Sequence, residues 1–279
     1  MKPGPFHTGQ SCWASYSLLG ASKKYRNKTC VYCGVPGAST TADHVIAREF
    51  FPKDDRHNLP QVPACVACNN SKSALEHYIL SVLPLGGRHN GADIAISDQV
   101  KPRLAKNQKL AMSIAEAQRQ FVVLDAERNW HVGTITPFDV GKLEALAIFI
   151  GQGLAWHHWQ IQLAPDSLAD ARRINSEGTK YFRGQMTGAA CGGQVKATLG
   201  KDVFRYHRAY QRTNRLKTIW EMTFFGGVEI GPLSAGGESA RTIFAVSSNE
   251  KNWFEHVAEF QRENVVPSNV GVWSPELPL

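Results

Sequence analysis

The chain has 279 residues, of which 43% are hydrophobic and 20% are charged, and its formal net charge at pH 7 is +7. This composition is that of a soluble globular protein with a real core in one large domain or two smaller ones, and no segment is long and apolar enough to cross a bilayer. The modest excess of positive charge favours a polyanionic partner, but it does not identify one.

Residues 1–28 open the chain with little periodicity and are predicted to form an N-terminal arm. They contain no sustained apolar stretch before a small-residue cleavage site, so no signal peptide is expected. The best candidate for a membrane span, 143–159, is interrupted by Glu144 and by His157-His158, and it predicts a buried helix instead. The sequence therefore predicts a cytoplasmic protein with no membrane partner.

Four of the six cysteines form two Cys-x-x-Cys pairs, Cys30 with Cys33 and Cys65 with Cys68. Paired spacing of this kind indicates thiolate metal ligands in a reducing compartment rather than a disulfide framework. Zinc prefers four tetrahedral ligands, and two such turns are among its commonest structural cages. The sequence thus predicts one structural zinc, whose closed site leaves no open position for a substrate.

The segment between and after these pairs alternates in character. Residues 40–45 predict a short strand, and 52–57 form a polar loop. Apolar residues then recur at helical spacing, which predicts an amphipathic helix over 71–83 that ends at Pro84. The expected local order is knuckle, strand, loop, knuckle and helix.

Beyond this segment, residues 88–102 are rich in Gly, Asp, Asn and Ser and are expected to be a linker. Apolar periodicity predicts a helix over 110–121 and another that begins at Pro137, with Thr136 as its N-cap. A third helix is expected over 167–177. The region from residue 103 onward thus begins with helices.

The last third of the chain is richer in β-branched and aromatic residues. These residues predict antiparallel strands over 203–210, 219–225 and 242–246, separated by glycine pairs. Helices followed by strands give an α+β fold class.

Two dipeptides lie between the cysteine pairs, Asp43-His44 and Asn58-Leu59, and Asn69 follows Cys68 directly. This pattern resembles the HNH, or ββα-metal, endonuclease family, and the resemblance covers residues 30–83. It implies a zinc-stabilised ββα-metal module over 29–87. The 88–102 linker and an α+β domain over 103–279, of unknown role, would follow it.

The resemblance assigns roles position by position. It makes Asp43 and Asn69 ligands of a catalytic Mg²⁺ or Mn²⁺ ion, His44 the general base, and Asn58 the residue that orients the loop holding His44. Lys72 occupies the position of the family's lysine after the second knuckle, and we expect it to contact substrate. Phosphodiester hydrolysis needs an activated water and a neutralised leaving oxygen, which a neutral imidazole and a hard cation can provide.

The function implied by the resemblance is a one-metal endonuclease that hydrolyses phosphodiester bonds, with DNA favoured over RNA as the substrate. Family members often act in restriction or antiviral defence, which suggests a biological context. Two alternatives stay open: an RNA-directed nuclease, and a non-catalytic zinc-knuckle module that binds nucleic acid or protein. The larger domain could contact substrate, bind a protein partner or regulate the module.

Basic residues interleave with aromatic residues between positions 201 and 220. A stripe of this kind could follow a phosphate backbone, with Arg205, Arg208 and Arg212 as candidate contacts. The alternative is a strand with one solvated basic face and one aromatic core face.

Overall fold

The computed structural model describes residues 24–87, 89–124, 130–163, 167–232, 239–266 and 270–278. Most of the predicted N-terminal arm, 1–28, lies outside these ranges, as does one of the predicted glycine turns, Gly236-Gly237. The fold is α+β: most helices precede an antiparallel sheet, as the sequence predicts. No helix among the described residues combines the length and apolar character needed to span a membrane.

The first unit consists of two short antiparallel strands and a long helix. Strand β1 (Thr41–His44) pairs with β2 (Gln61–Ala64), and α1 (Val66–Val82) follows at once. Two single 3-10 turns, Arg48–Phe50 and Lys53–Asp55, lie between the strands. The strand predicted over 40–45 is confirmed.

Helix α1 begins five residues before the predicted start at residue 71. The reason is its cap: the Cys65 thiol sulfur accepts a hydrogen bond from the backbone N–H of Cys68 at 3.4 Å. An N-cap acceptor satisfies one of the free donors of the first turn. Cysteine is not among the usual capping residues, so the sequence pattern placed the start too late.

The linker expected over 88–102 is instead helical from Asn90 onward. The chain continues through η3 (Leu83–Gly86), α2 (Asn90–Ala95), the π-helical turn η4 (Ile96–Val100), α3 (Lys101–Lys106) and α4 (Gln108–Ala117). This stretch buries small apolar side chains, namely Ala92, Ala95 and Val100. Their spacing of three and five residues gives one buried face. The Gly, Asp and Asn content masked that face.

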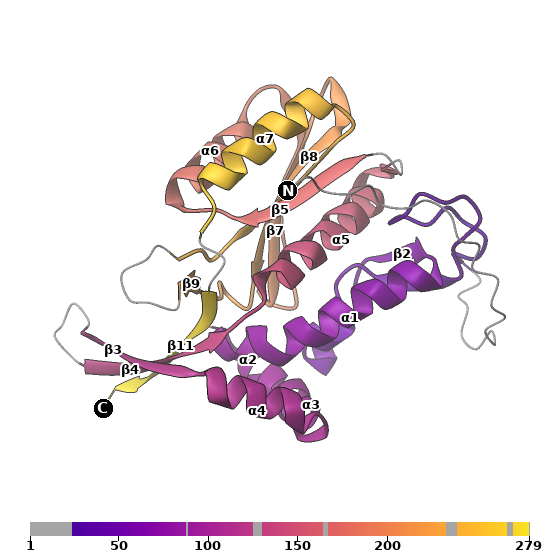
Figure 1. Cartoon of the computed structure of the whole chain (residues 1–279). Coiled ribbons are helices and arrows are strands. Elements are labelled where there is room, and N and C mark those ends of the chain that lie inside the picture. The colour runs from indigo at the N-terminus through magenta and orange to yellow at the C-terminus, as the bar shows by residue number, and fades with distance from the viewer. Residues whose placement is uncertain are drawn as a thin grey trace, which may run out of the picture.

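A four-stranded antiparallel sheet extends from the body, as Figure 1 shows. Its order is β3-β4-β11-β9, with the strands β3 (Arg119–Leu124), β4 (Trp130–Pro137), β11 (Val270–Pro278) and β9 (Ile230–Pro232). The helix predicted over 110–121 is therefore correct only as far as Ala117.

Helix α5 (Val140–Trp159) lies at the centre of the fold, between α1 and the larger sheet (Figure 1). It starts at Asp139 rather than at the predicted N-cap, Thr136, because Thr136 and Pro137 pair with β11. The backbone hydrogen-bonding groups at Thr136 and Pro137 are satisfied by pairing in the sheet, so these residues are not available to start the helix.

The larger sheet has five antiparallel strands in the order β5-β10-β8-β7-β6. Their bounds are β5 (Leu168–Arg173), β6 (Cys191–Leu199), β7 (Phe204–Gln211), β8 (Asn214–Phe224) and β10 (Ile243–Ser248). The three predicted strands, 203–210, 219–225 and 242–246, are confirmed as β7, β8 and β10. Helices α6 (Ser176–Thr187) and α7 (Lys251–Glu263) cover the face opposite α5.

The helix predicted over 167–177 is wrong. Residues 168–173 instead form edge strand β5, which pairs with β10 along its whole length and places Ala171 opposite Ala245, and only Ser176 and Glu177 of the predicted range are helical. Helix α6 starts later, capped by the Asn175 side chain. The sequence Leu-Ala-Asp-Ala-Arg-Arg favours a helix locally, but a free sheet edge overrides that preference.

One hydrophobic core joins the first unit to the rest of the protein. It contains Val45 and Phe50 of the first unit, Ile150 of α5 and Trp220 of β8. The contact with α5 is close: a Cβ on Gly153 would meet Val45 side-chain atoms at 2.9 Å. The first unit is therefore packed on the larger region and not held by a tether.

Candidate functional site

The four paired cysteines converge at the start of α1. Their sulfur atoms all lie within 4.8 Å of one another, and Cys33 Sγ lies 3.9 Å from Cys65 Sγ. Four sulfurs at the usual Zn–S distance of about 2.3 Å around a tetrahedral ion would be about 3.8 Å apart. The spacing and the thiol chemistry of the cluster are compatible with one structural zinc.

Backbone donors surround this cluster. The N–H of Cys65 donates to Cys30 Sγ at 3.3 Å, and the N–H of Cys68 donates to Cys65 Sγ. The Cys68 thiol and then backbone groups lower the pKa of Cys30 to about 4, against the opposing effect of burial. Burial raises the pKa of Cys33 to about 11, and the hydrogen bond with Cys30 raises the pKa of Cys68, so Cys30 is the first of these three thiols to ionise. A thiolate is the form that binds metal, so binding of a metal ion would release protons from the other two.

A second polar cluster lies between β1 and α1. Asp43 is 7% exposed, and its Oδ2 accepts a hydrogen bond from the Tyr32 hydroxyl at 2.5 Å. The ammonium of Lys72 lies 3.2 Å from Asp43 Oδ2 and donates to Glu76 Oε1 at 2.5 Å and to the His44 carbonyl at 2.7 Å. We call Tyr32, Asp43, Lys72 and Glu76 the Lys72 network.

Electrostatics in the Lys72 network follow from burial. Burial, with the nearby Asp43 charge as the next cause, raises the pKa of Tyr32, so its hydroxyl stays protonated and donates. Burial also raises the pKa of Glu76 to about 7, although the Lys72 ammonium lowers it. The network can thus gain or lose one proton near neutral pH.

Lys72, for which a substrate contact was predicted, lies inside the protein. Its side chain is fully buried, and its ammonium has acceptors on Asp43, His44 and Glu76. A buried ammonium needs such partners because desolvation is costly. Lys72 therefore positions the Asp43-His44 dipeptide against α1.

His44 lies next to Asp43 but faces the other side of β1, as alternation along a strand requires. The ring is half-buried, and its Nε2 lies 2.9 Å from the amide nitrogen of Gln61 on β2. With that amide donating, Nε2 holds a lone pair. Burial and then the Arg48 charge lower the pKa of His44, so the ring is neutral near pH 7.

The two predicted asparagines occupy different settings. Asn69 lies in the first turns of α1, half-exposed, and its side-chain amide has no hydrogen-bond partner among the described residues. It precedes Lys72 by three positions and so lies on the same side of the helix. The structure thus brings Asp43, His44 and the Asn69 side of α1 into one region.

Asn58 lies in the exposed turn just before β2, with φ at +58°. Asparagine is several-fold enriched in this left-handed region, which explains the residue by its backbone. Its side chain makes no hydrogen bond with other described residues. Its predicted role in orienting the His44 loop stays a prediction.

The predicted basic stripe does not share one face. Arg205 and Arg208 are three residues apart on β7, so they point to opposite faces of the sheet. The Arg208 guanidinium lies over the Trp159 ring at 5.2 Å on the α5 side, and Arg205 pairs with Asp202. Arg212 is exposed just beyond the end of β7.

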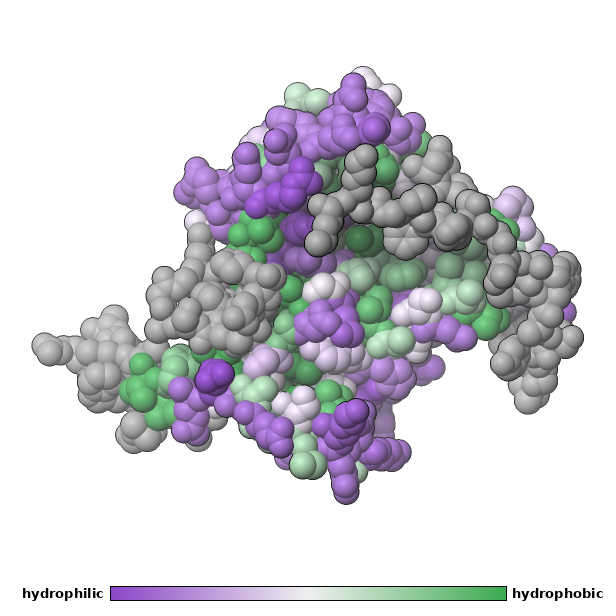
Figure 2. All heavy atoms as spheres, in the orientation of Figure 1, coloured by the Kyte–Doolittle hydropathy of each residue, from purple (hydrophilic) through white to green (hydrophobic). Residues whose placement is uncertain are grey.

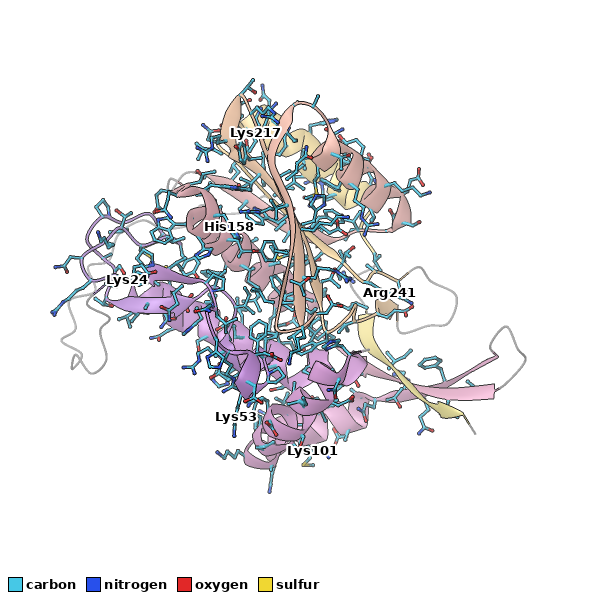
Figure 3. All side chains as sticks on the ribbon, turned by 180° about the vertical axis from the view of Figure 1, so that it is seen from behind. Lys24, Lys53, Lys101, His158, Lys217 and Arg241 are labelled. Atoms are coloured by element: carbon cyan, nitrogen blue, oxygen red, sulfur yellow. The ribbon has the colours of Figure 1, made fainter. Side chains whose placement is uncertain are left out.

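Two other cations of that stripe also have acidic partners. Lys217 is buried and lies 2.7 Å from Glu250, at the end of the molecule seen in Figure 3, while Lys201 pairs with Asp55. The structure therefore does not bring these cations onto one continuous surface, and their contact with a phosphate backbone stays a prediction. The exposed charges of the stripe are separated or already neutralised.

Sequence reasoning missed Tyr32, Gln61 and Glu76, which contact the predicted residues directly. Glu76 has a signal, because it follows Lys72 by four helical positions. Gln61 becomes visible only once the register of β1 and β2 is known. We found no sequence signal for Tyr32.

No family model, curated protein or solved structure matches this chain. The chemistry that can indicate a function lies in the two polar clusters. Both clusters draw on α1, which contributes Cys68 to the first and Lys72 and Glu76 to the second.

Proposed function

We propose that residues 30–83 form an HNH-type, ββα-metal endonuclease module that hydrolyses phosphodiester bonds, with DNA as the preferred substrate. The observation that carries the proposal is the placement of Asp43-His44. The dipeptide lies on a strand held against α1 by Lys72, and a four-thiol cluster lies at the start of the same helix. Two strands between the cysteine pairs, followed by a helix that begins at the second pair, support this assignment.

In this proposal His44 is the general base. Its Nε2 can take a proton from an attacking water once the Gln61 amide yields its hydrogen bond. The bond from Lys72 to the His44 carbonyl holds the backbone, so the ring is aimed before substrate arrives. Lowering of the His44 pKa is compatible with this role, but the proposal rests on the geometry.

Asp43 and Asn69 are the proposed ligands of a divalent cation. When bound, such a cation supplies neutralisation of charge on the leaving oxygen. A carboxylate has about four lone-pair positions. Tyr32 and Lys72 together occupy three positions on Asp43, which leaves one ligand bond to a cation. The free amide oxygen of Asn69 is a second donor of the hard type that Mg²⁺ prefers.

The test is cleavage by the zinc-loaded full chain. With Mg²⁺ or Mn²⁺ we expect it to cut duplex or single-stranded DNA, and to cut RNA more slowly. His44→Ala should reduce the rate by about 10²- to 10⁴-fold, the usual contribution of a general base, with zinc content unchanged. If the wild-type chain cleaves none of these polymers in either metal, the enzymatic proposal fails.

One observation favours a second candidate, a non-catalytic zinc-knuckle module. Asp43 is buried and largely saturated by Tyr32 and Lys72, as expected of a structural hydrogen-bonded aspartate. This candidate predicts nucleic-acid or protein binding that is equal in wild type and His44→Ala, without cleavage by either.

A further inference from the structure

A cleft of about 630 Å³ opens between α1, α3 and α4, away from both polar clusters. Its lining is supplied by seven residues: His77, Tyr78 and Ser81 of α1, Arg103, Lys106 and Asn107 around the end of α3, and Leu110 of α4. The lining combines two basic side chains, Arg103 and Lys106, with polar residues and with Tyr78 and Leu110. The cleft therefore suits an anionic ligand.

A run of cations lies on this side of the protein. It consists of Lys101, Arg103, Lys106 and Lys109, and the exposed acidic residues Asp98 and Glu116 flank it on either side in the sequence. None of the four forms an ion pair with any residue that the structure describes. In the predicted stripe on β7 and β8, by contrast, Lys201 and Lys217 each have an acidic partner.

The wall of the cleft is arranged to keep its charge available. Arg103 Nη1 contacts His77 Nδ1, and because arginine can only donate, that histidine nitrogen accepts. This contact orients the guanidinium without neutralising it. Nearby Asp139 is engaged elsewhere, since it pairs with Lys142, whose ammonium lies over the Tyr78 ring.

Helix α1 connects the cleft to the proposed catalytic region. Asn70 and His77 are seven residues apart, close to two turns, so they share one exposed face. The sole acidic residue of α1 is Glu76, which is buried against Lys72. A polyanion lying along this exposed face would meet no negative charge from the helix.

The length of the path fits a nucleic-acid backbone. From Asn69 to His77 the helix rises about 12 Å. Duplex DNA carries one phosphate per strand about every 3.4 Å along its axis, so this rise spans three to four nucleotides. Figure 3 places Lys101 on the helices at the end of the molecule opposite Lys217, and hydrophilic side chains gather over α3 in Figure 2.

We propose that the cleft between α1, α3 and α4 is a subsite for the sugar–phosphate backbone of the substrate, with Arg103 and Lys106 as its phosphate contacts. The subsite lies three to four nucleotides from the phosphate at His44. This inference rests on the proposed function, because it assigns a further contact to the same nucleic acid. Cations without acidic partners, beside a face of α1 without exposed acids, favour a polyanionic backbone over an uncharged ligand.

The experiment measures binding of labelled duplex DNA, single-stranded DNA and RNA to the zinc-loaded full chain carrying His44→Ala, across salt concentrations. The test variant carries Arg103→Gln and Lys106→Gln in addition to His44→Ala. The matched control adds Lys180→Gln and Lys251→Gln, which remove two exposed lysines from α6 and α7. Thermal unfolding confirms that each chain is folded, and Lys106→Gln alone, with Lys180→Gln alone as its control, replaces the first variant if Arg103→Gln destabilises it.

For duplex DNA, each lost phosphate contact should reduce the slope of log affinity against log salt by about 0.9, or about 1.8 for two. At 0.1 M salt this corresponds to a loss of affinity of roughly 60-fold, with little change in the control. Equal behaviour of the variant and the control overturns the subsite, even if the wild-type chain cleaves DNA.

Other outcomes separate the subsite from the nuclease. Loss of binding in the variant, with no cleavage by wild type, supports the subsite and rejects the enzyme. Binding of none of the three polymers rejects both. The last experiment uses polyglutamate as the probe. If polyglutamate binds the chain, if the Arg103→Gln, Lys106→Gln variant loses that binding, and if none of the nucleic acids binds, the cleft belongs to an acidic protein partner and the subsite is rejected.

Discussion

Two polar clusters flank the same small unit, and they are held together by different means. The cysteine cluster brings together four thiols, which a metal ion can cross-link at the start of α1. The Lys72 network is held by ion pairs and hydrogen bonds among side chains already in place. A chelator can therefore empty the first cluster, whereas the second changes with protons and substitutions.

This difference matters because the unit is small. β1 and β2 have four residues each, too few to be stable alone. The apolar side chains of the first unit pack on α5, so the larger region supplies part of the stability of this unit. We infer that the cysteine cluster holds the chain ends of the unit together, and that the Lys72 network fixes the orientation of Asp43-His44 inside it.

The largest expected effect comes from the cysteine cluster. Cys68→Ser should abolish stoichiometric zinc binding and unfold the start of α1, since structural zinc sites of small domains contribute about 10–16 kcal/mol of apparent binding free energy at pH 7. Metal analysis and thermal unfolding measure the two effects. Cys191→Ser, outside the cluster, is the control and should keep about one zinc per chain. If the zinc-free Cys68→Ser chain is as stable as wild type, the cysteine cluster does not hold the unit together and the contrast with the Lys72 network is wrong.

The next effect comes from Lys72. Lys72→Met leaves Asp43 buried without its cation, and breaking a buried pair in this way costs about 3–5 kcal/mol. Zinc content should stay at the wild-type value, because Lys72 contacts none of the thiols. Chemical denaturation measures the loss, with exposed Lys106→Met as control. A loss below about 1 kcal/mol, the range of surface pairs, would show that the network is solvated.

Glu76 sharpens the comparison through pH. Because burial raises the folded-state pKa of Glu76 to about 7 from an ordinary value of 4.5, the folded state binds a proton that the unfolded state releases. The contribution of Glu76 to the free energy of unfolding should therefore be greatest below pH 4.5 and should be lost as the pH rises to about 7. The upper limit of this contribution is about 3 kcal/mol, and Glu76→Gln should remove it. An unchanged pH profile in Glu76→Gln would assign the proton elsewhere.

The two clusters also differ in how far sequence could predict them. Cysteine spacing is local and specific, so the four thiols were predicted together, and the structure brings them within ligand distance. For the second cluster, the sequence pattern pointed to Asp43 and His44 but did not predict that Lys72 is buried. Burial of Lys72 depends on how α1 packs on β1. The partners Tyr32 and Gln61 lie 11 and 17 residues from the groups they contact.

The same limit applies to the fold. Strands β7, β8 and β10 were predicted because their β-branched and aromatic residues express a preference that the sheet satisfies. The segment that forms β5 has a helical preference, and pairing with β10 overrides it. In the supposed linker, small apolar residues pack only because neighbouring helices are present, which no local pattern records.

The smallest effect tests whether Asp43 can serve a metal as the thiols do. Tyr32→Phe removes one hydrogen bond to the Asp43 carboxylate and should cost about 1.5–3 kcal/mol, the range for hydrogen bonds to charged groups. It also opens a second lone-pair position on Asp43. If Asp43 is a cation ligand, the Mg²⁺ concentration giving half-maximal cleavage should fall, although the protein is less stable. If that concentration is unchanged and only stability falls, Asp43 is a structural member of the Lys72 network, and the unit binds metal through its thiols alone.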